Sequence, residues 1–178
     1  WLDHLVLLFR GQDLDDTELT RFGQRFGGLV VGSKRFADIR QRPAEFPYIN
    51  VISNVIGADG VPIGNLGFGE AVWHTDMSYI AEPPDGSILH ALEVPESGGD
   101  TSFCNMYAAW ETLPSDLRRA VQGRLLKHDA SYNSAGRLRP DCVPVTDVTV
   151  SPGPLHPVVR THPETGHDAL FLGRRPHS

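Results

Sequence analysis

In the first part of the chain, two segments differ in the spacing of their apolar residues. Residues 5–9 form a continuous apolar run, and its short length favours a buried strand over a helix. In residues 13–28 the period changes, because Leu19, Phe22 and Phe26 recur at helical spacing. Acidic residues occupy the first turn and a glycine pair ends the pattern, so we predict an amphipathic helix of about three turns.

The middle of the chain reads as short strands separated by loops. Residues 32–49 mix charge and proline and predict a loop, whereas residues 50–56 predict a strand. Glycines and a proline mark residues 57–69 as a long flexible loop, which we expect to act as a lid. Residues 86–94 and 98–105 are strand-like segments on either side of a breaker cluster.

The last third combines helix signals with a hairpin. Asn105 and Ser115 are candidate caps for helices over residues 106–113 and 116–122. Within residues 156–173, two strand-like arms flank the turn sequence PETG and predict a hairpin. Strands outnumber helices without regular alternation, which favours a mainly β sandwich or barrel with added helices over a doubly wound sheet.

Composition narrows the function classes. The chain has 178 residues, 40% hydrophobic content and a net charge of -6 without a basic run, which favours one compact domain and small-molecule chemistry over nucleic-acid or membrane binding. Cys104 and Cys142 are too few for a disulfide framework, and no apolar run is long enough to span a membrane. We expect a cytoplasmic protein and leave a homo-oligomer open.

The segment VWHTDMSY carries the candidate chemistry. On an extended segment, residues two apart share a face, so His74 and Asp76 present an imidazole and a carboxylate together. With a second histidine from elsewhere, this pair makes the 2-His-1-carboxylate triad of non-haem iron oxygenases. The spacing alone is weak evidence, since a surface histidine and aspartate in a strand at the edge of a loop have the same pattern.

Several further segments, taken in order, resemble the taurine dioxygenase and 2,4-dichlorophenoxyacetate dioxygenase family. They are LLFRGQ, RFGGL, NVISNV, VWHTDMSY, PPDGSILHALEVPESGGDTSFCNMYAAWETLP, KHDASYN and HPVVRTHPETGHDALFLGRR. The resemblance implies a mainly β fold with flanking helices, a distorted double-stranded β-helix or jelly roll. It also implies an Fe(II)- and 2-oxoglutarate-dependent dioxygenase that hydroxylates an unactivated C–H bond of a small substrate and releases succinate and carbon dioxide.

The resemblance carries roles over to individual residues. It implies that His74 and Asp76 are Fe(II) ligands and that Thr101 binds a carboxylate of the co-substrate 2-oxoglutarate. Dioxygen is the other co-substrate. The positions expected to contact the organic substrate, which we take to be an anion, are Met77, Asn133 and Ser134. For Met77, plain core packing is an equal alternative.

The third ligand of the family is a histidine in a motif that this sequence does not contain. We therefore expect it beyond residue 178, and expect a single dioxygenase domain that also lacks its N-terminal start and C-terminal strands here. The alternative is a short form with weak metal binding and no turnover. His156 and His162 are predicted to be structural, and the weaker candidates are His4, His90, His128, His167 and His177.

Two rival readings remain open at this point. One is a cupin-like protein that binds a metal or ligand without oxidising anything, and the other is a hydrolytic zinc site, because zinc also accepts histidine and aspartate ligands. Dependence on 2-oxoglutarate separates both from the dioxygenase reading. Arg174 and Arg175 are read as a solvated surface pair, with an anion contact as the alternative.

Overall fold

The computed structural model describes residues 1–31, 45–66, 73–133, 136–140 and 142–173. The chain separates into two compact units. The first unit comprises Trp1–Gln12, Leu89–Leu126 and Leu155–Leu172, and the second comprises Asp13–Ile88, Lys127–Pro154 and Gly173–Ser178. In the described part of the chain, no helix has the length and apolar character needed to cross a bilayer.

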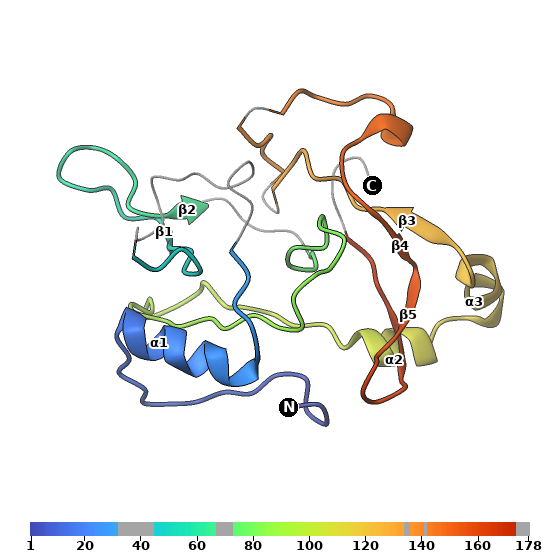
Figure 1. The fold of residues 1–178 in the computed structure, drawn as a ribbon, viewed down its shortest axis with the longest axis horizontal. Helices are drawn as coiled ribbons and strands as arrows, with labels where there is room; N and C mark the ends of the chain where they lie inside the picture. The colour runs from blue at the N-terminus through green and yellow to red at the C-terminus, as the bar shows by residue number, and fades with distance from the viewer. Residues whose placement is uncertain (32–44, 67–72, 134–135, 141, 174–178) are drawn as a thin grey trace. The chain divides into compact units, whose positions relative to one another are not determined.

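The predicted N-terminal helix is present as α1, Asp16–Gly23, continued by the 3-10 turn η1, Gln24–Phe26 (Figure 1). Asp15 and Glu18 form a reciprocal capping box: the Asp15 carboxylate accepts from the Glu18 N–H at 2.7 Å, and the Glu18 carboxylate accepts from the Asp15 N–H at 3.0 Å. Gly27 follows with φ 134°, a conformation that ends the helical pattern where the sequence predicted it.

The two later helices are α2, Met106–Glu111, and α3, Ser115–Val121. The predicted cap of α2 is confirmed, because Asn105 Oδ1 accepts from the N–H groups of Tyr107 and Ala108, both at 3.0 Å. For α3 the predicted cap is wrong. Pro114 occupies the cap position, where its carbonyl accepts from the Arg118 N–H at 2.8 Å, and Ser115 is already the first helical residue.

The strands are short and pair two by two. They are β1 Ile52–Ser53, β2 Asn65–Leu66, β3 Leu125–Lys127, β4 Leu155–Pro157, β5 Val159–Thr161 and β6 Asp168–Leu170. β1 pairs with β2 in parallel, β3 pairs with β4, and β5 pairs with β6 in an antiparallel hairpin, as predicted. The sequence does not predict β3, and β2 lies inside residues 57–69, for which the sequence predicts a loop. No closed barrel forms among the described residues.

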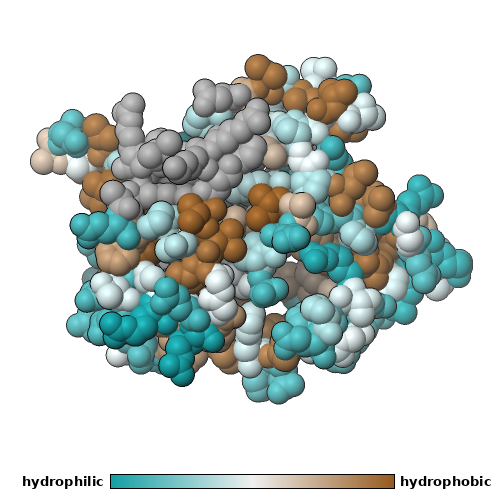
Figure 2. All heavy atoms as spheres, viewed as in Figure 1, coloured by the Kyte–Doolittle hydropathy of each residue, from teal (hydrophilic) through white to brown (hydrophobic). Residues whose placement is uncertain are grey.

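Three predicted strands are absent. The described residues 5–9, 86–94 and 98–105 contain no strand, and most of their apolar side chains are exposed, with Leu92 at 80% and Val94 at 76%. Figure 2 shows apolar residues at the surface of the displayed face. A strand forms only against a hydrogen-bonded neighbour, so an apolar run without such a neighbour stays extended and irregular.

The first unit has an apolar core. Trp110 on α2 packs with Val158 and with Leu170 on β6, and Figure 1 shows α2 beside the orange-red hairpin. The guanidinium of Arg118 lies 4.6 Å from the centre of the Trp110 ring and donates to the Trp110 carbonyl at 2.8 Å. These contacts tie α2, α3 and the hairpin together.

In the second unit, the most deeply buried side chains are polar. The largest that are fully buried are His128, Asp129, Ser78, Ser131 and Ser151. A buried polar group needs a partner to offset its lost hydration. Asp129 meets this need in part by accepting hydrogen bonds from Ser131 and Ser151. Ser78 lies two residues after Asp76, one of the two predicted metal-binding residues.

Candidate metal centre

Asp76 is the first residue of a turn, and His74 lies two residues before it. Residues 76–79 form the turn, which closes with a hydrogen bond from the Ile80 N–H to the Met77 carbonyl at 3.1 Å. The expected extended conformation is therefore wrong over this part of the segment. The expected proximity of the two side chains nevertheless occurs.

The imidazole and the carboxylate approach each other directly. Nε2 of His74 lies 3.1 Å from Oδ1 of Asp76, and the side chains are 24% and 60% exposed. This distance suits a hydrogen bond when Nε2 carries a proton. When Nε2 has no proton, both atoms present lone pairs to the same region, which is the arrangement that a shared cation requires.

Ser87 fixes the other side of the carboxylate. Its hydroxyl donates to Oδ2 of Asp76 at 3.0 Å, which leaves Oδ1 as the oxygen that faces His74. Hydrogen bonds of this kind orient metal-binding carboxylates. Sequence reasoning missed Ser87, because nothing in its spacing from Asp76, eleven residues away, marks it as a partner.

The residues predicted to contact the substrate differ in what the structure shows. Met77 is half-buried in the turn, with φ 49°. Asn133 is also half-buried, and its Oδ1 accepts from the Arg137 N–H at 2.9 Å, which closes a local loop. Ser134 lies outside the described residues. The substrate role of all three stays a prediction.

The predicted co-substrate residue, Thr101, is exposed and belongs to the first unit, whereas His74 and Asp76 belong to the second. Its role toward 2-oxoglutarate stays a prediction. The predicted lid over residues 57–69 lies partly outside the described residues. Arg174 and Arg175 lie outside them entirely. No group of three or more metal-binding side chains occurs in the described part of the chain.

The structure gives two other histidines packing or capping contacts. Nδ1 of His162 accepts from the N–H groups of Glu164 and Thr165 at 3.2 and 3.4 Å, and thereby closes the turn between β5 and β6. The ring of His156 packs edge-on against Phe171, with 5.2 Å between ring centres. Both contacts agree with the structural roles that the sequence predicted.

His128, a weak ligand candidate by sequence, is fully buried in the second unit. The backbone N–H of His128 donates to the Pro154 carbonyl at 2.9 Å. The neighbouring Asp129 accepts from the Ser151 hydroxyl and from the Ser131 N–H through Oδ1. These bonds fix the position of the segment that follows β3.

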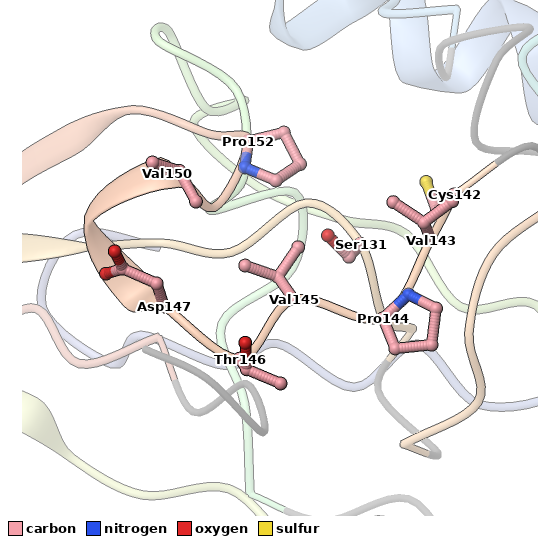
Figure 3. A pocket seen from close by; sticks show the side chains of 9 residues that line it. All are labelled: Ser131, Cys142, Val143, Pro144, Val145, Thr146, Asp147, Val150 and Pro152. Carbon is pink, nitrogen blue, oxygen red and sulfur yellow. The ribbon is translucent and has the colours of Figure 1, made fainter.

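A cavity of about 390 Å³ lies next to this buried segment (Figure 3). Its lining is mainly apolar and includes Cys142, Val145 and Val150, with the Asp147 carboxylate at its edge. Hydrogen bonds from the hydroxyl and the N–H of Thr149 lower the pKa of Asp147 below its usual value of 3.8. Neither His74 nor Asp76 lines this cavity, so it is separate from the predicted metal centre.

Comparison with known proteins identifies similar sequences along the whole chain. Residues 1–178 match the family described as taurine catabolism dioxygenase TauD, TfdA family. The chain is 36% identical to the alpha-ketoglutarate-dependent 2,4-dichlorophenoxyacetate dioxygenase of Burkholderia sp. (strain RASC), over 94% of this chain and 58% of that protein. It is 34% identical to an alkylsulfatase of Acinetobacter baylyi, over 97% of this chain and 52% of that protein.

A solved structure is also similar. It is the crystal structure of a proposed alpha-ketoglutarate-dependent taurine dioxygenase from Burkholderia xenovorans, with a TM-score of 0.60 and 28% identity. The match covers 93% of this chain and 48% of that chain. This chain therefore spans between about half and three fifths of the length of these relatives.

Proposed function

We propose that this chain, which belongs to the taurine catabolism dioxygenase TauD, TfdA family, supplies two metal ligands to an Fe(II)- and 2-oxoglutarate-dependent dioxygenase. The observation that carries the proposal is the approach of His74 Nε2 to Asp76 Oδ1 at 3.1 Å. The family match over the whole chain supports the choice of chemistry, because the two residues stand in the motif that carries the resemblance.

The donor pair fits an octahedral ion. Two adjacent ligands that each lie about 2.1 Å from a metal are about 3.0 Å apart when the angle between the bonds is 90°. The 3.1 Å separation of His74 Nε2 and Asp76 Oδ1 needs little adjustment to reach this value. Bound Fe(II) supplies, with 2-oxoglutarate and dioxygen, the oxidation of a substrate C–H bond, with succinate and carbon dioxide as products.

We propose that other residues orient a metal ligand or bind the co-substrate and the organic substrate. Ser87 holds Oδ2 of Asp76, so that the carboxylate presents one oxygen to the metal. The hydroxyl of Thr101 donates to a carboxylate of 2-oxoglutarate, an anion that requires hydrogen-bond donors. Met77, Asn133 and Ser134 border the organic substrate.

We further propose that the organic substrate is a small anion. The names of relatives support this, since they are a 2,4-dichlorophenoxyacetate dioxygenase and an alpha-ketoglutarate-dependent sulfate ester dioxygenase. We also propose that the fold is a distorted jelly roll. The structural similarity to the Burkholderia xenovorans protein supports this. The antiparallel hairpin of β5 and β6 is compatible with such a fold.

Anaerobic addition of Fe(II) and 2-oxoglutarate to the purified protein tests the proposal. We expect the weak visible charge-transfer band of an Fe(II)–2-oxoglutarate chelate in the wild type and in Asp85→Ala, a matched change of an exposed acid nearby. The Asp76→Ala variant should lose the band, because it loses a charged ligand. Thr101→Ala should keep the metal and weaken the apparent affinity for 2-oxoglutarate.

The rival readings predict other results. A zinc hydrolase would show activity with Zn(II) that does not depend on 2-oxoglutarate, and a cupin-like binding protein would bind metal without forming succinate. A band that persists in Asp76→Ala would refute the ligand assignment. An unchanged affinity for 2-oxoglutarate in Thr101→Ala would refute the co-substrate assignment.

A further inference from the structure

The turn that begins at Asp76 contains a backbone conformation that is unfavourable for a residue other than glycine. Met77 has φ 49°, in the left-handed region, where a side chain crowds the following carbonyl. Such a conformation persists when the surrounding structure fixes it. The hydrogen bond from the Ile80 N–H to the Met77 carbonyl closes the turn, and contacts from outside the turn supply the remaining constraint.

The first outside contact is made by Arg139. Its guanidinium lies 4.3 Å from the centre of the Tyr79 ring, at the end of the turn. Nε of the same side chain donates to the Tyr132 carbonyl at 3.1 Å, and the backbone N–H of Arg139 donates to the Ser131 carbonyl at 2.8 Å. Because Arg139 is fixed at both backbone and side chain, its guanidinium is a stable support for the Tyr79 ring.

The second outside contact is at Ser78, which Gly173 approaches closely. This residue is fully buried, and a Cβ added at Gly173 would meet its hydroxyl at 2.8 Å and would also overlap Nδ1 of His128. Ser78 and His128 thus both lie against Gly173, where the absence of a side chain makes room for them. His128 is itself held through its N–H by the Pro154 carbonyl.

From these contacts, we propose that Arg139 is a positioning residue for the metal centre. It holds Tyr79, and with it the turn of residues 76–79, in the conformation that places Asp76 beside His74. Ser78 of the same turn packs against Gly173, as His128 does. The expected effect on metal affinity rests on the proposed function. The contacts of Arg139 do not, because they are present in the metal-free chain.

Hydrogen–deuterium exchange of the metal-free protein tests the contact without reference to activity. We expect Arg139→Ala to raise the exchange of amides in residues 76–80 several-fold, since the turn loses its support. Exchange in the β5–β6 hairpin, which lies in the other unit, should not change. Arg137→Ala is the matched control, because it removes an exposed arginine two positions away and leaves the contact with Tyr79 in place.

Fe(II) affinity, measured anaerobically on the same variants, tests the consequence. Loss of a residue that orients a ligand weakens metal binding by roughly 10- to 100-fold, and we expect Arg139→Ala to fall at the lower end. Arg139→Lys keeps a cation near the ring but loses the planar fork, so its affinity should be intermediate. If Arg139→Ala does not fold, Tyr79→Leu against Tyr79→Phe makes the same test, because only phenylalanine keeps the ring.

Each result has a definite meaning. Unchanged exchange at residues 76–80 together with an Fe(II) affinity within twofold of wild type would overturn the proposal. A rise in exchange that extends over both units would also overturn it, because Arg139 would then act on global stability alone. If the wild type binds no Fe(II), the proposed function fails, while a rise confined to residues 76–80 still supports the positioning contact.

Discussion

Removal of the Ser87 hydroxyl is the sharpest test of how the carboxylate ligand is oriented. Its hydrogen bond to Asp76 is charge-assisted, and such bonds contribute about 1.5 to 3 kcal/mol net. The Asp76 side chain is 60% exposed, so water replaces part of the lost bond and we reduce the expected contribution to about 1 kcal/mol. Since about 1.4 kcal/mol corresponds to a tenfold change, Ser87→Ala should weaken Fe(II) binding about fivefold.

The assay is an anaerobic Fe(II) titration in the presence of saturating 2-oxoglutarate, followed by the visible band. Ser87→Thr keeps a hydroxyl and should remain near the wild-type affinity, whereas Ser97→Ala removes an exposed serine elsewhere and serves as the control. Global stability to urea should change little in any of the three. Equal affinities for Ser87→Ala and Ser87→Thr would refute the argument that this hydroxyl orients Asp76.

Three further predictions concern the stability of the fold. Gly173→Ala should destabilise the protein by about 1 to 3 kcal/mol in urea unfolding, because the new methyl group overlaps His128; an unchanged midpoint would contradict that packing. Because the pKa of Asp147 is lowered in the folded state, its stabilising contribution is complete above about pH 4 and is lost as the pH falls through the folded pKa. The stability difference between wild type and Asp147→Asn, measured from pH 2 to 6, should therefore narrow toward low pH, and a constant difference would count against the Thr149 hydrogen bonds as its cause. Asn105→Ala should cost about 1 kcal/mol through loss of the α2 cap, measured by thermal unfolding, with Asn105→Asp as the variant that keeps the cap.

The sequence predicted helices better than strands, and the reason is physical. Helix α1 carries its own hydrogen bonds, its capping box and its stop signal within one continuous segment. The apolar runs at residues 5–9 and 86–94 have the composition of strands, but a strand also needs a partner from elsewhere in the chain. Composition cannot supply this partner, so these runs were predicted as strands and the structure shows none.

The same distinction applies to the candidate site. His74 and Asp76 are two residues apart, so a sequence motif could indicate that their side chains meet. Their contacts with the rest of the chain could not be predicted, because Ser87 and Arg139 reach the turn through the fold and belong to no motif. The extended conformation expected for the pair is wrong at Asp76, which begins a turn, although the two side chains still approach each other.

The local origin of the His74–Asp76 pair limits what it can do alone. Two donors from one short segment offer an ion a site with most of its coordination positions open, and the described residues contain no third donor grouped with them. Affinity then depends on how little the pair must reorganise on binding, which is why Ser87 and Arg139 carry the predicted effects. If both variants bind Fe(II) as tightly as wild type, the turn is sufficiently rigid by itself. The left-handed Met77 and its hydrogen bond to Ile80 would then be the whole positioning device.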